Sequence, residues 1–206
     1  MYLVTTPQWF KWLYPSLTWR VRTKQKELYL TFDDGPHEEA TPFVLDCLKA
    51  YVAKATFFCL GKNVQSYPEI FHRIIDEGHS IGNHTHNHVN GWKTSTETYI
   101  EDVCEARKHI DSKLFRPPYG RITRFQSKVL IEKMNMKVVM WDVLSGDFDL
   151  ALSPEGCLKN VARNAIAGSI VVFHDSSKAW PKLKHALPGV LQKFSNDGFA
   201  FKRLEE

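Results

Sequence analysis

The chain has 206 residues, with 27 basic and 23 acidic side chains and a formal net charge of +4. This length suits one large hydrophobic core, and no Pro/Gly/Ser-rich linker or run of charge divides it, so the sequence predicts a single domain. The basic residues form no dense block, which argues against nucleic acid as a partner, and no apolar run is long enough to span a bilayer.

The N-terminal segment, residues 1–26, is rich in aromatic side chains but is interrupted by Pro7, Lys11 and Pro15. It lacks the basic start and unbroken apolar stretch of a signal peptide, which favours a cytoplasmic location and leaves association with the envelope open. We expect this segment to pack against a domain formed by residues 27–206. The protein is expected to be a monomer. A membrane-surface anchor is the alternative, disfavoured because few basic residues flank the aromatics. The four cysteines form no Cys-x-x-Cys pair and are expected to be reduced thiols.

Strand-like and helix-like stretches alternate from residue 27 to the end. The first strand ends at residue 33 on two adjacent carboxylates, Asp33 and Asp34, which a Gly-Pro turn follows. Roughly seven βα units follow one another, which predicts a parallel α/β sheet, either open or closed into a barrel. The remaining strands are expected at 55–60, 79–82, 113–116, 137–141, 169–173 and 198–204. The helices are expected at 42–52, 68–77, 94–112, 123–134, 154–167 and 188–196.

Unusual polar side chains follow five of these strands. The C-terminal ends of parallel barrel strands converge on one face, where the active sites of such barrels are built. Five separated segments are therefore expected to meet in one pocket. In chain order they contribute Asp33 and Asp34, His84 and His88, Arg116 and Tyr119, Asp142 and Asp147, and His174 and Asp175.

The paired carboxylates point to a metal. Adjacent carboxylates resist ionising together unless a cation or a basic group lies between them. Two imidazoles and one carboxylate are a common ligand set for catalytic Zn²⁺, and they leave a position open for water. His84 and His88, four residues apart, can face the same ion. His86 between them leaves a second register open, and a histidine-rich surface loop is the non-functional alternative.

Five segments, read together, resemble a known family. They are TFDDGP at 31–36, HTxxH at 84–88, RPPYG at 116–120, the stretch 141–148, and VFHD at 172–175. In this order they resemble the motifs of the NodB-homology polysaccharide deacetylases, carbohydrate esterase family 4, and the resemblance extends from residue 27 to about 204. It implies a distorted (β/α)7 barrel and metal-dependent removal of acetyl groups from N-acetylated sugars.

The resemblance implies one divalent metal, held by Asp34, His84 and His88. Zn²⁺ is the expected ion, and Co²⁺ and Ni²⁺ suit the same donors. The substrates implied are glycans of the chitin or peptidoglycan type, or their soluble precursors.

The resemblance also assigns roles in the chemistry. Asp33 would be the general base that takes a proton from the attacking water, and Arg116 would hold and orient it. A backbone N–H near Tyr119 would stabilise the charge that develops on the carbonyl oxygen. His174 would protonate the departing amine, and Asp147 would keep it protonated by raising its pKa.

Four further positions are expected to shape the substrate pocket. Phe148 stands where the family pattern has Trp, and Val172 stands where it has Leu, so the acyl pocket stays apolar but changes shape. Trp92 and Trp180 follow the third and sixth predicted strands. Each either stacks on a sugar ring or pads the barrel rim, and the sequence favours neither interpretation.

Three classes of function remain open. The first is the metal-dependent sugar N-deacetylase. The second is a barrel relative that hydrolyses a small non-sugar amide or cyclic amide in the cytosol. The third is a non-catalytic carbohydrate-binding protein, which is disfavoured because Asp33, Asp34, Arg116 and His174 are all present.

Overall fold

The structure, a computed structural model, describes residues 2–206. Within this range eight strands form one sheet in the order β5-β4-β3-β2-β1-β7-β6, with β8 paired to β1, and all paired strands are parallel. The strands are β1 (Glu27–Asp33), β2 (Thr56–Cys59), β3 (Ser80–Asn83), β4 (Leu114–Phe115), β5 (Lys137–Val138), β6 (Val143–Leu144), β7 (Ile170–His174) and β8 (Ala200–Phe201).

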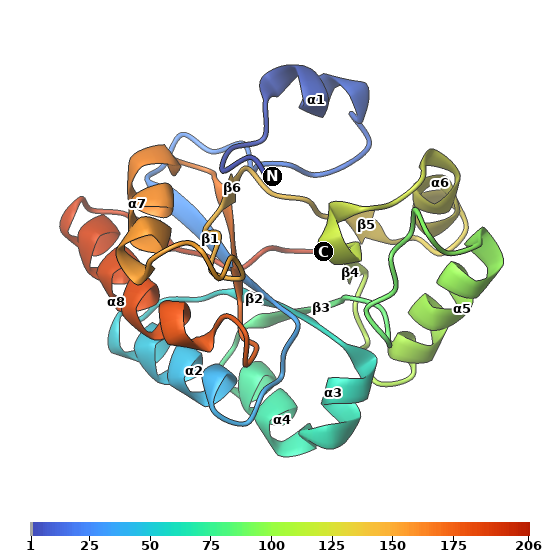
Figure 1. Cartoon of the computed structure of the whole chain (residues 1–206), viewed down its shortest axis with the longest axis horizontal. Coiled ribbons are helices and arrows are strands. Elements are labelled where there is room, and N and C mark those ends of the chain that lie inside the picture. Colours follow the sequence, from blue (N-terminus) through green and yellow to red (C-terminus); the bar gives the residue numbers. More distant parts are fainter. Residues whose placement is uncertain (1) are drawn as a thin grey trace.

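Helices surround the curled sheet on its outer side, as Figure 1 shows. The predicted parallel α/β barrel of the distorted (β/α)7 type is therefore confirmed. Within residues 2–206 no helix has the length and apolar character needed to cross a membrane. The helices are α1 (Gln8–Leu13), α2 (Ala40–Ala50), α3 (Gly61–Ser66), α4 (Pro68–Asp76), α5 (Thr96–Arg107), the 3-10 turn η1 (Pro118–Gly120), α6 (Arg124–Glu132), α7 (Pro154–Asn164) and α8 (Trp180–Asn196).

The structure differs from the sequence expectation at a few elements. The helix expected at 188–196 begins at Trp180, and Pro188 lies inside it. Proline removes one helical hydrogen bond, but Leu183, Leu187 and Leu191 bury the same face against the core on both sides of it, which outweighs that loss. The strand expected at 137–141 is shorter, and β6 follows as a separate strand. Helices α1 and α3 were not expected.

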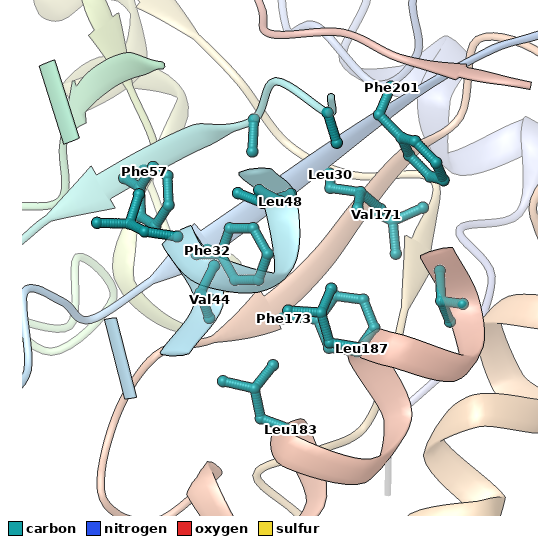
Figure 2. Packing of buried hydrophobic residues seen from close by; sticks show 14 of the residues in the cluster. Leu30, Phe32, Val44, Leu48, Phe57, Val171, Phe173, Leu183, Leu187 and Phe201 are labelled. Atoms are coloured by element: carbon teal, nitrogen blue, oxygen red, sulfur yellow. The ribbon is translucent and has the colours of Figure 1, made fainter. Parts of the chain in front are cut away.

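Strand β1 is buried on both faces and separates two environments. Leu28, Leu30 and Phe32 belong to the large cluster that fills the space between the sheet and helices α2 and α8 (Figure 2). Successive side chains of a strand point to opposite faces, so Thr31 and Asp33 face the barrel interior. The outer face thus supplies the apolar packing, while the inner face delivers polar groups to the C-terminal end of the strand.

The N-terminal segment lies between the two edge strands, β5 and β6. The Thr18 N–H donates to the Val138 carbonyl at 2.9 Å, and the Leu144 N–H donates to the Val4 carbonyl at 2.8 Å. Figure 1 shows this segment, with α1, on the side of the barrel where β5 and β6 are not joined to each other. The segment therefore occupies the open side of the barrel through backbone hydrogen bonds to both edges. All four cysteines in the described chain are free.

Candidate active site

A cavity of about 460 Å³ opens at the C-terminal ends of the strands. It is lined by acidic, imidazole and aromatic side chains from separate parts of the chain, which agrees with the expected convergence of the five segments. Among the sequence-predicted site residues, those that line it are Asp33, Asp34, His84, His88, Tyr119, Phe148, Val172 and His174.

Asp33 and Arg116 form a buried ion pair at the base of the cavity. The Arg116 Nη1 donates to Asp33 Oδ1 at 2.7 Å, and both side chains are almost fully buried. The same nitrogen donates to Thr31 Oγ1 at 2.6 Å. Asp33 pairs in register with His174 of the neighbouring strand β7. The parallel register therefore sets a carboxylate and an imidazole side by side at the strand ends.

Arg116 is held on every side. Its remaining donors reach the Val139 carbonyl at 3.3 Å and the Met140 carbonyl at 2.9 Å. The guanidinium carbon lies 4.1 Å from the ring centroid of Phe58, a cation–π contact. Burial lowers the pKa of Arg116, and the charge of Asp33 opposes that change. With its donors used in this way, the guanidinium fixes the position of the Asp33 carboxylate.

The second acid–base pair of the site joins the His174 imidazole to the Asp147 carboxylate. Asp147 Oδ2 accepts from the His174 backbone N–H at 2.7 Å, and Oδ1 lies 2.8 Å from the ring Nδ1. Burial by itself would lower the pKa of His174, but the charge and hydrogen bond of Asp147 raise it to about 10. Asp147 thus favours the charged imidazolium, and Nδ1 is the ring nitrogen that faces it.

Asp34, His84 and His88 bring their donor atoms within 4.8 Å of one another. His88 Nε2 lies 3.2 Å from Asp34 Oδ1, and His84 Nε2 lies 3.7 Å from the same oxygen. That oxygen is buried and has no hydrogen-bond partner. A buried carboxylate oxygen without a donor is costly, and a cation between these three groups would satisfy it. The donor set fits Zn²⁺ and leaves room for further ligands.

Both imidazoles are oriented through their second nitrogen. His84 Nδ1 lies 2.7 Å from the Arg116 carbonyl, which can only accept, so Nδ1 carries the proton and Nε2 presents a lone pair. Burial lowers the pKa of His84 to about 4, so the ring is neutral, as a metal ligand must be. His88 Nδ1 lies 3.1 Å from the Tyr119 hydroxyl. Tyr119 therefore contacts one of the candidate ligands in addition to lining the cavity.

The loops that carry these groups are strained. Six non-glycine residues in the described chain have positive φ, and four of them lie in the site: Asp34, Thr85, His88 and Tyr119. Left-handed backbone is unfavourable for residues with a Cβ and persists where the surroundings enforce it, which is common at functional sites. Burial would raise the pKa of Asp34, but the nearby imidazoles, His88 first among them, hold it well below its usual range.

The alternative in which His86 replaces one of the two assigned histidine ligands does not match this geometry. His86 is absent from the group of converging donor atoms in the described chain. Its ring packs against α3, where a Cβ on Gly61 would lie 2.5 Å from His86 Nδ1. Its backbone N–H donates to Asp102 Oδ1 at 2.7 Å, which turns the loop so that His84 and His88 share one side.

The two tryptophans lie outside the cavity lining. Trp180 packs edge-on against Phe43, 5.0 Å between ring centroids, so it pads the outer layer and does not offer a stacking face to the cavity. Trp92 is 63% exposed, and the guanidinium of Arg121, a cavity residue, lies over its ring at 5.3 Å. Trp92 therefore contacts a cavity residue without lining the cavity itself.

Sequence reasoning did not predict several contacts that position the site. Asp175 Oδ1 accepts from the Gly35 N–H at 3.1 Å, and Asn63 Nδ2 donates to the Asp34 carbonyl at 2.6 Å. Both fix the turn that follows Asp33. Asp175 was expected in the pocket beside His174, but without this contact to the turn, and Asn63 lies in the unexpected helix α3. Tyr2, which lines the cavity, gave no signal because it lies far from every motif.

Comparison with known proteins places the chain among enzymes with this architecture. The family model described as polysaccharide deacetylase matches residues 20–139. A peptidoglycan-N-acetylglucosamine deacetylase of Bacillus cereus is 35% identical over 92% of this chain and 92% of its own length. A chitooligosaccharide deacetylase of Azorhizobium caulinodans is 34% identical over 76% of this chain and 77% of its own.

The structural comparison agrees. A crystal structure of a peptidoglycan N-acetylglucosamine deacetylase in complex with a naphthyl N-hydroxybenzamide superposes with a TM-score of 0.87 at 33% identity, covering 97% of this chain and 95% of the other.

Proposed function

Since the chain belongs to the polysaccharide deacetylase family, we propose that it hydrolyses the N-acetyl groups of N-acetylglucosamine-containing glycans and releases acetate. The observation that carries this proposal is the meeting, in one cavity, of a fixed carboxylate, an imidazole paired with a buried carboxylate, and a cluster of metal-ligand type. Amide hydrolysis needs a base for water, an acid for the amine and stabilisation of the carbonyl oxygen, and these groups supply the first two.

Asp33 acts on the nucleophile. Its carboxylate takes a proton from water as the water oxygen forms a bond to the acetyl carbonyl carbon. Arg116, buried and bonded to Asp33 Oδ1, keeps the carboxylate in place during this transfer. The resulting tetrahedral centre carries negative charge on the former carbonyl oxygen, which a backbone donor near Tyr119 would stabilise.

His174 acts on the leaving group. As the carbon–nitrogen bond breaks and the carbonyl re-forms, the imidazolium gives its proton to the sugar nitrogen, so that a neutral amine departs and leaves acetic acid, which loses its proton to solvent to give acetate. Asp147 stabilises the charged form of this acid before the transfer. Asp34, His84 and His88 would hold a divalent cation, for which we propose Zn²⁺; when bound, it would supply Lewis-acid polarisation of the carbonyl and would lower the pKa of nearby water.

The charge of the cavity lining bears on which class of glycan the protein prefers. Two cationic side chains, Arg121 and Lys178, are part of the cavity lining. Chitin-type oligomers are neutral, whereas peptidoglycan-type fragments carry carboxylates. We therefore expect faster turnover of peptidoglycan-type fragments, and we expect added salt to reduce that preference because screening weakens exposed charge interactions.

The test is acetate release by metal-stripped protein, with and without added Zn²⁺, from chitin-type oligomers and from peptidoglycan fragments. Release that depends on Zn²⁺ supports the proposal. Full activity in a demonstrably metal-free sample would contradict it. Turnover restricted to cyclic amides in the same assay would instead support the alternative, a relative that cleaves small amides.

A further inference from the structure

We propose that the N-terminal segment is part of the active site, and that Tyr2 is a specificity-determining residue that closes the acyl end of the cavity. This inference rests on the proposed deacetylase function, because it concerns the acyl group of that substrate. Tyr2 is one of the residues that line the cavity, although it precedes the first family motif by about thirty positions.

Backbone pairing with β6 brings Tyr2 to this place. The Leu144 N–H donates to the Val4 carbonyl at 2.8 Å, and the Thr6 N–H donates to the Asp142 carbonyl at 3.1 Å. These bonds run the first residues of the chain antiparallel to β6, as the isolated bridge between Thr5 and Val143 also shows. Continuing in this direction, the chain reaches the C-terminal end of β6, which is the end where the cavity opens.

The ring of Tyr2 packs on the acyl side of the cavity. Its centroid lies 5.0 Å from that of Phe148 at an interplanar angle of 59°. Phe148 in turn meets His174 edge-on at 5.3 Å. Leu144 and Val172 are the aliphatic members of the same lining. Tyr2 is thus the outer member of an apolar wall whose inner members contact the imidazole assigned as the acid.

The hydroxyl end of Tyr2 is fixed by the loop that carries Asp147. A Cβ on Gly146 would lie 2.6 Å from the Tyr2 hydroxyl oxygen, so only glycine allows this approach, and Gly146 also has a φ of +80°. Burial, followed by the nearby Asp149 carboxylate, raises the pKa of Tyr2 to about 12, so the hydroxyl stays neutral. The ring is therefore held at both ends and forms a fixed boundary.

The wall has a consequence for the acyl group. Phe148 and Val172 are smaller than the residues of the family pattern, which would leave space beside the acetyl methyl group. The phenol of Tyr2 packs against Phe148 in the same cavity lining, where it would take up part of that space. Removal of the phenol should admit longer acyl chains, and pocket contacts discriminate by about tenfold for each methylene.

The experiment compares N-acetyl, N-propionyl and N-butyryl versions of one glucosamine oligomer with Zn²⁺-loaded protein. Tyr2→Ala should lower the acetyl-over-butyryl ratio of kcat/KM by about tenfold or more, while Tyr2→Phe, which keeps the ring, should retain the wild-type ratio. Trp12→Ala is the matched control, because Trp12 is an exposed aromatic of the same segment and is absent from the cavity lining in the described chain. Thermal melting of each variant reports folding.

The outcomes separate the two proposals. If wild-type protein releases no acyl group, the deacetylase proposal fails and the role of Tyr2 fails with it. If wild-type protein releases acetate but Tyr2→Ala keeps the wild-type acyl preference, only the role of Tyr2 is overturned. An equal change in preference for Trp12→Ala would also overturn it, since the effect would then belong to the segment and not to the wall. If Tyr2→Ala unfolds at too low a temperature to be assayed, Tyr2→Leu replaces it. We expect Tyr2→Leu to show an acetyl-over-butyryl ratio between those of wild type and Tyr2→Ala. A wild-type ratio for Tyr2→Leu would overturn the role of Tyr2.

Discussion

The two sides of the cavity are built differently. On one side, Asp33 and His174 end adjacent strands, and Arg116 and Asp147 lock them by hydrogen bonds of 2.7 and 2.8 Å. On the other side, Asp34 and His88 lie on loops with left-handed backbone, and an Asp34 oxygen has no hydrogen-bond partner. The acid–base side is satisfied within the chain, whereas the ligand side leaves an Asp34 oxygen unpartnered, which is where we propose that a cation binds.

This difference suggests a division of labour. Residues that move protons must keep one position relative to the reacting atoms, and buried ion pairs on strands provide that. Ligands must instead converge on an ion from outside the chain, and strained loops carry them where the strands alone would not. We therefore expect changes on the acid–base side to affect rate or stability, and changes on the ligand side to affect metal affinity.

The largest expected effect is on rate. Asp33→Asn removes the base with little change in shape, so kcat should fall between about 10² and 10⁴-fold. Steady-state acetate release measures this. Asp46→Asn is the control, because Asp46 is an acid of an exposed ion pair with Arg73 and should leave kcat unchanged. A fall of less than tenfold for Asp33→Asn would remove Asp33 from the role of base.

Arg116→Met should cause the next largest effect, on stability. It leaves the Asp33 carboxylate buried without its partner, and breaking a buried ion pair costs about 3–5 kcal/mol of unfolding free energy. Denaturant titration measures the loss. The matched change Arg73→Met removes two surface ion pairs, with Asp46 and Glu77, and should cost less than about 1 kcal/mol. Equal losses for both variants would contradict the view of Arg116 as a buried anchor.

Asp147→Asn tests the pair of Asp147 and His174 through the pH dependence of kcat. Asp147 raises the pKa of His174 to about 10, and without its charge burial lowers that pKa. The acid works only when protonated, so activity falls as pH rises through the pKa of His174, and the variant should lose kcat at lower pH than wild type. A kcat profile between pH 6 and 10 measures the shift, with the exposed Asp76→Asn as control. Coincident profiles would show that Asp147 does not set the pKa of His174.

The smallest expected effect concerns the ligand side. Tyr119→Phe removes the hydroxyl that lies 3.1 Å from His88 Nδ1. Loss of such a supporting hydrogen bond weakens metal affinity by about tenfold. Competition with a chromophoric chelator measures the Zn²⁺ Kd. Tyr67→Phe, which removes a hydroxyl from a tyrosine outside the cavity lining, serves as control. An unchanged affinity for Tyr119→Phe would show that the hydroxyl does not support the ligand.

Much of this site could be predicted because its residues belong to short local patterns. Asp33 and Asp34 follow an apolar strand, and the parallel βα repeat places all strand ends on one face. The resemblance to a family then ordered the groups by role. The partners of these groups, such as Arg116 with Asp33, also lay within motifs.

Contacts between motifs and the rest of the chain could not be predicted. Tyr2 and Asn63 reach the site through pairing and helix placement that depend on the folded sheet. Trp92 and Trp180 follow the expected strands, yet their side chains are directed by neighbours, Arg121 and Phe43, that sequence spacing does not reveal. Pro188 likewise led us to expect that the last helix begins at residue 188. The helix begins earlier because burial of α8 against the core outweighs the cost of a proline inside it.

The most direct test of this two-sided site is a calorimetric titration of Zn²⁺ into metal-stripped wild type, Asp33→Asn and His88→Ala. The account predicts one site per chain in wild type, the same site with closely similar affinity in Asp33→Asn, and binding weakened by at least about tenfold in His88→Ala. Wild-type affinity in His88→Ala, or loss of binding in Asp33→Asn alone, would contradict the division between a ligand side and an acid–base side.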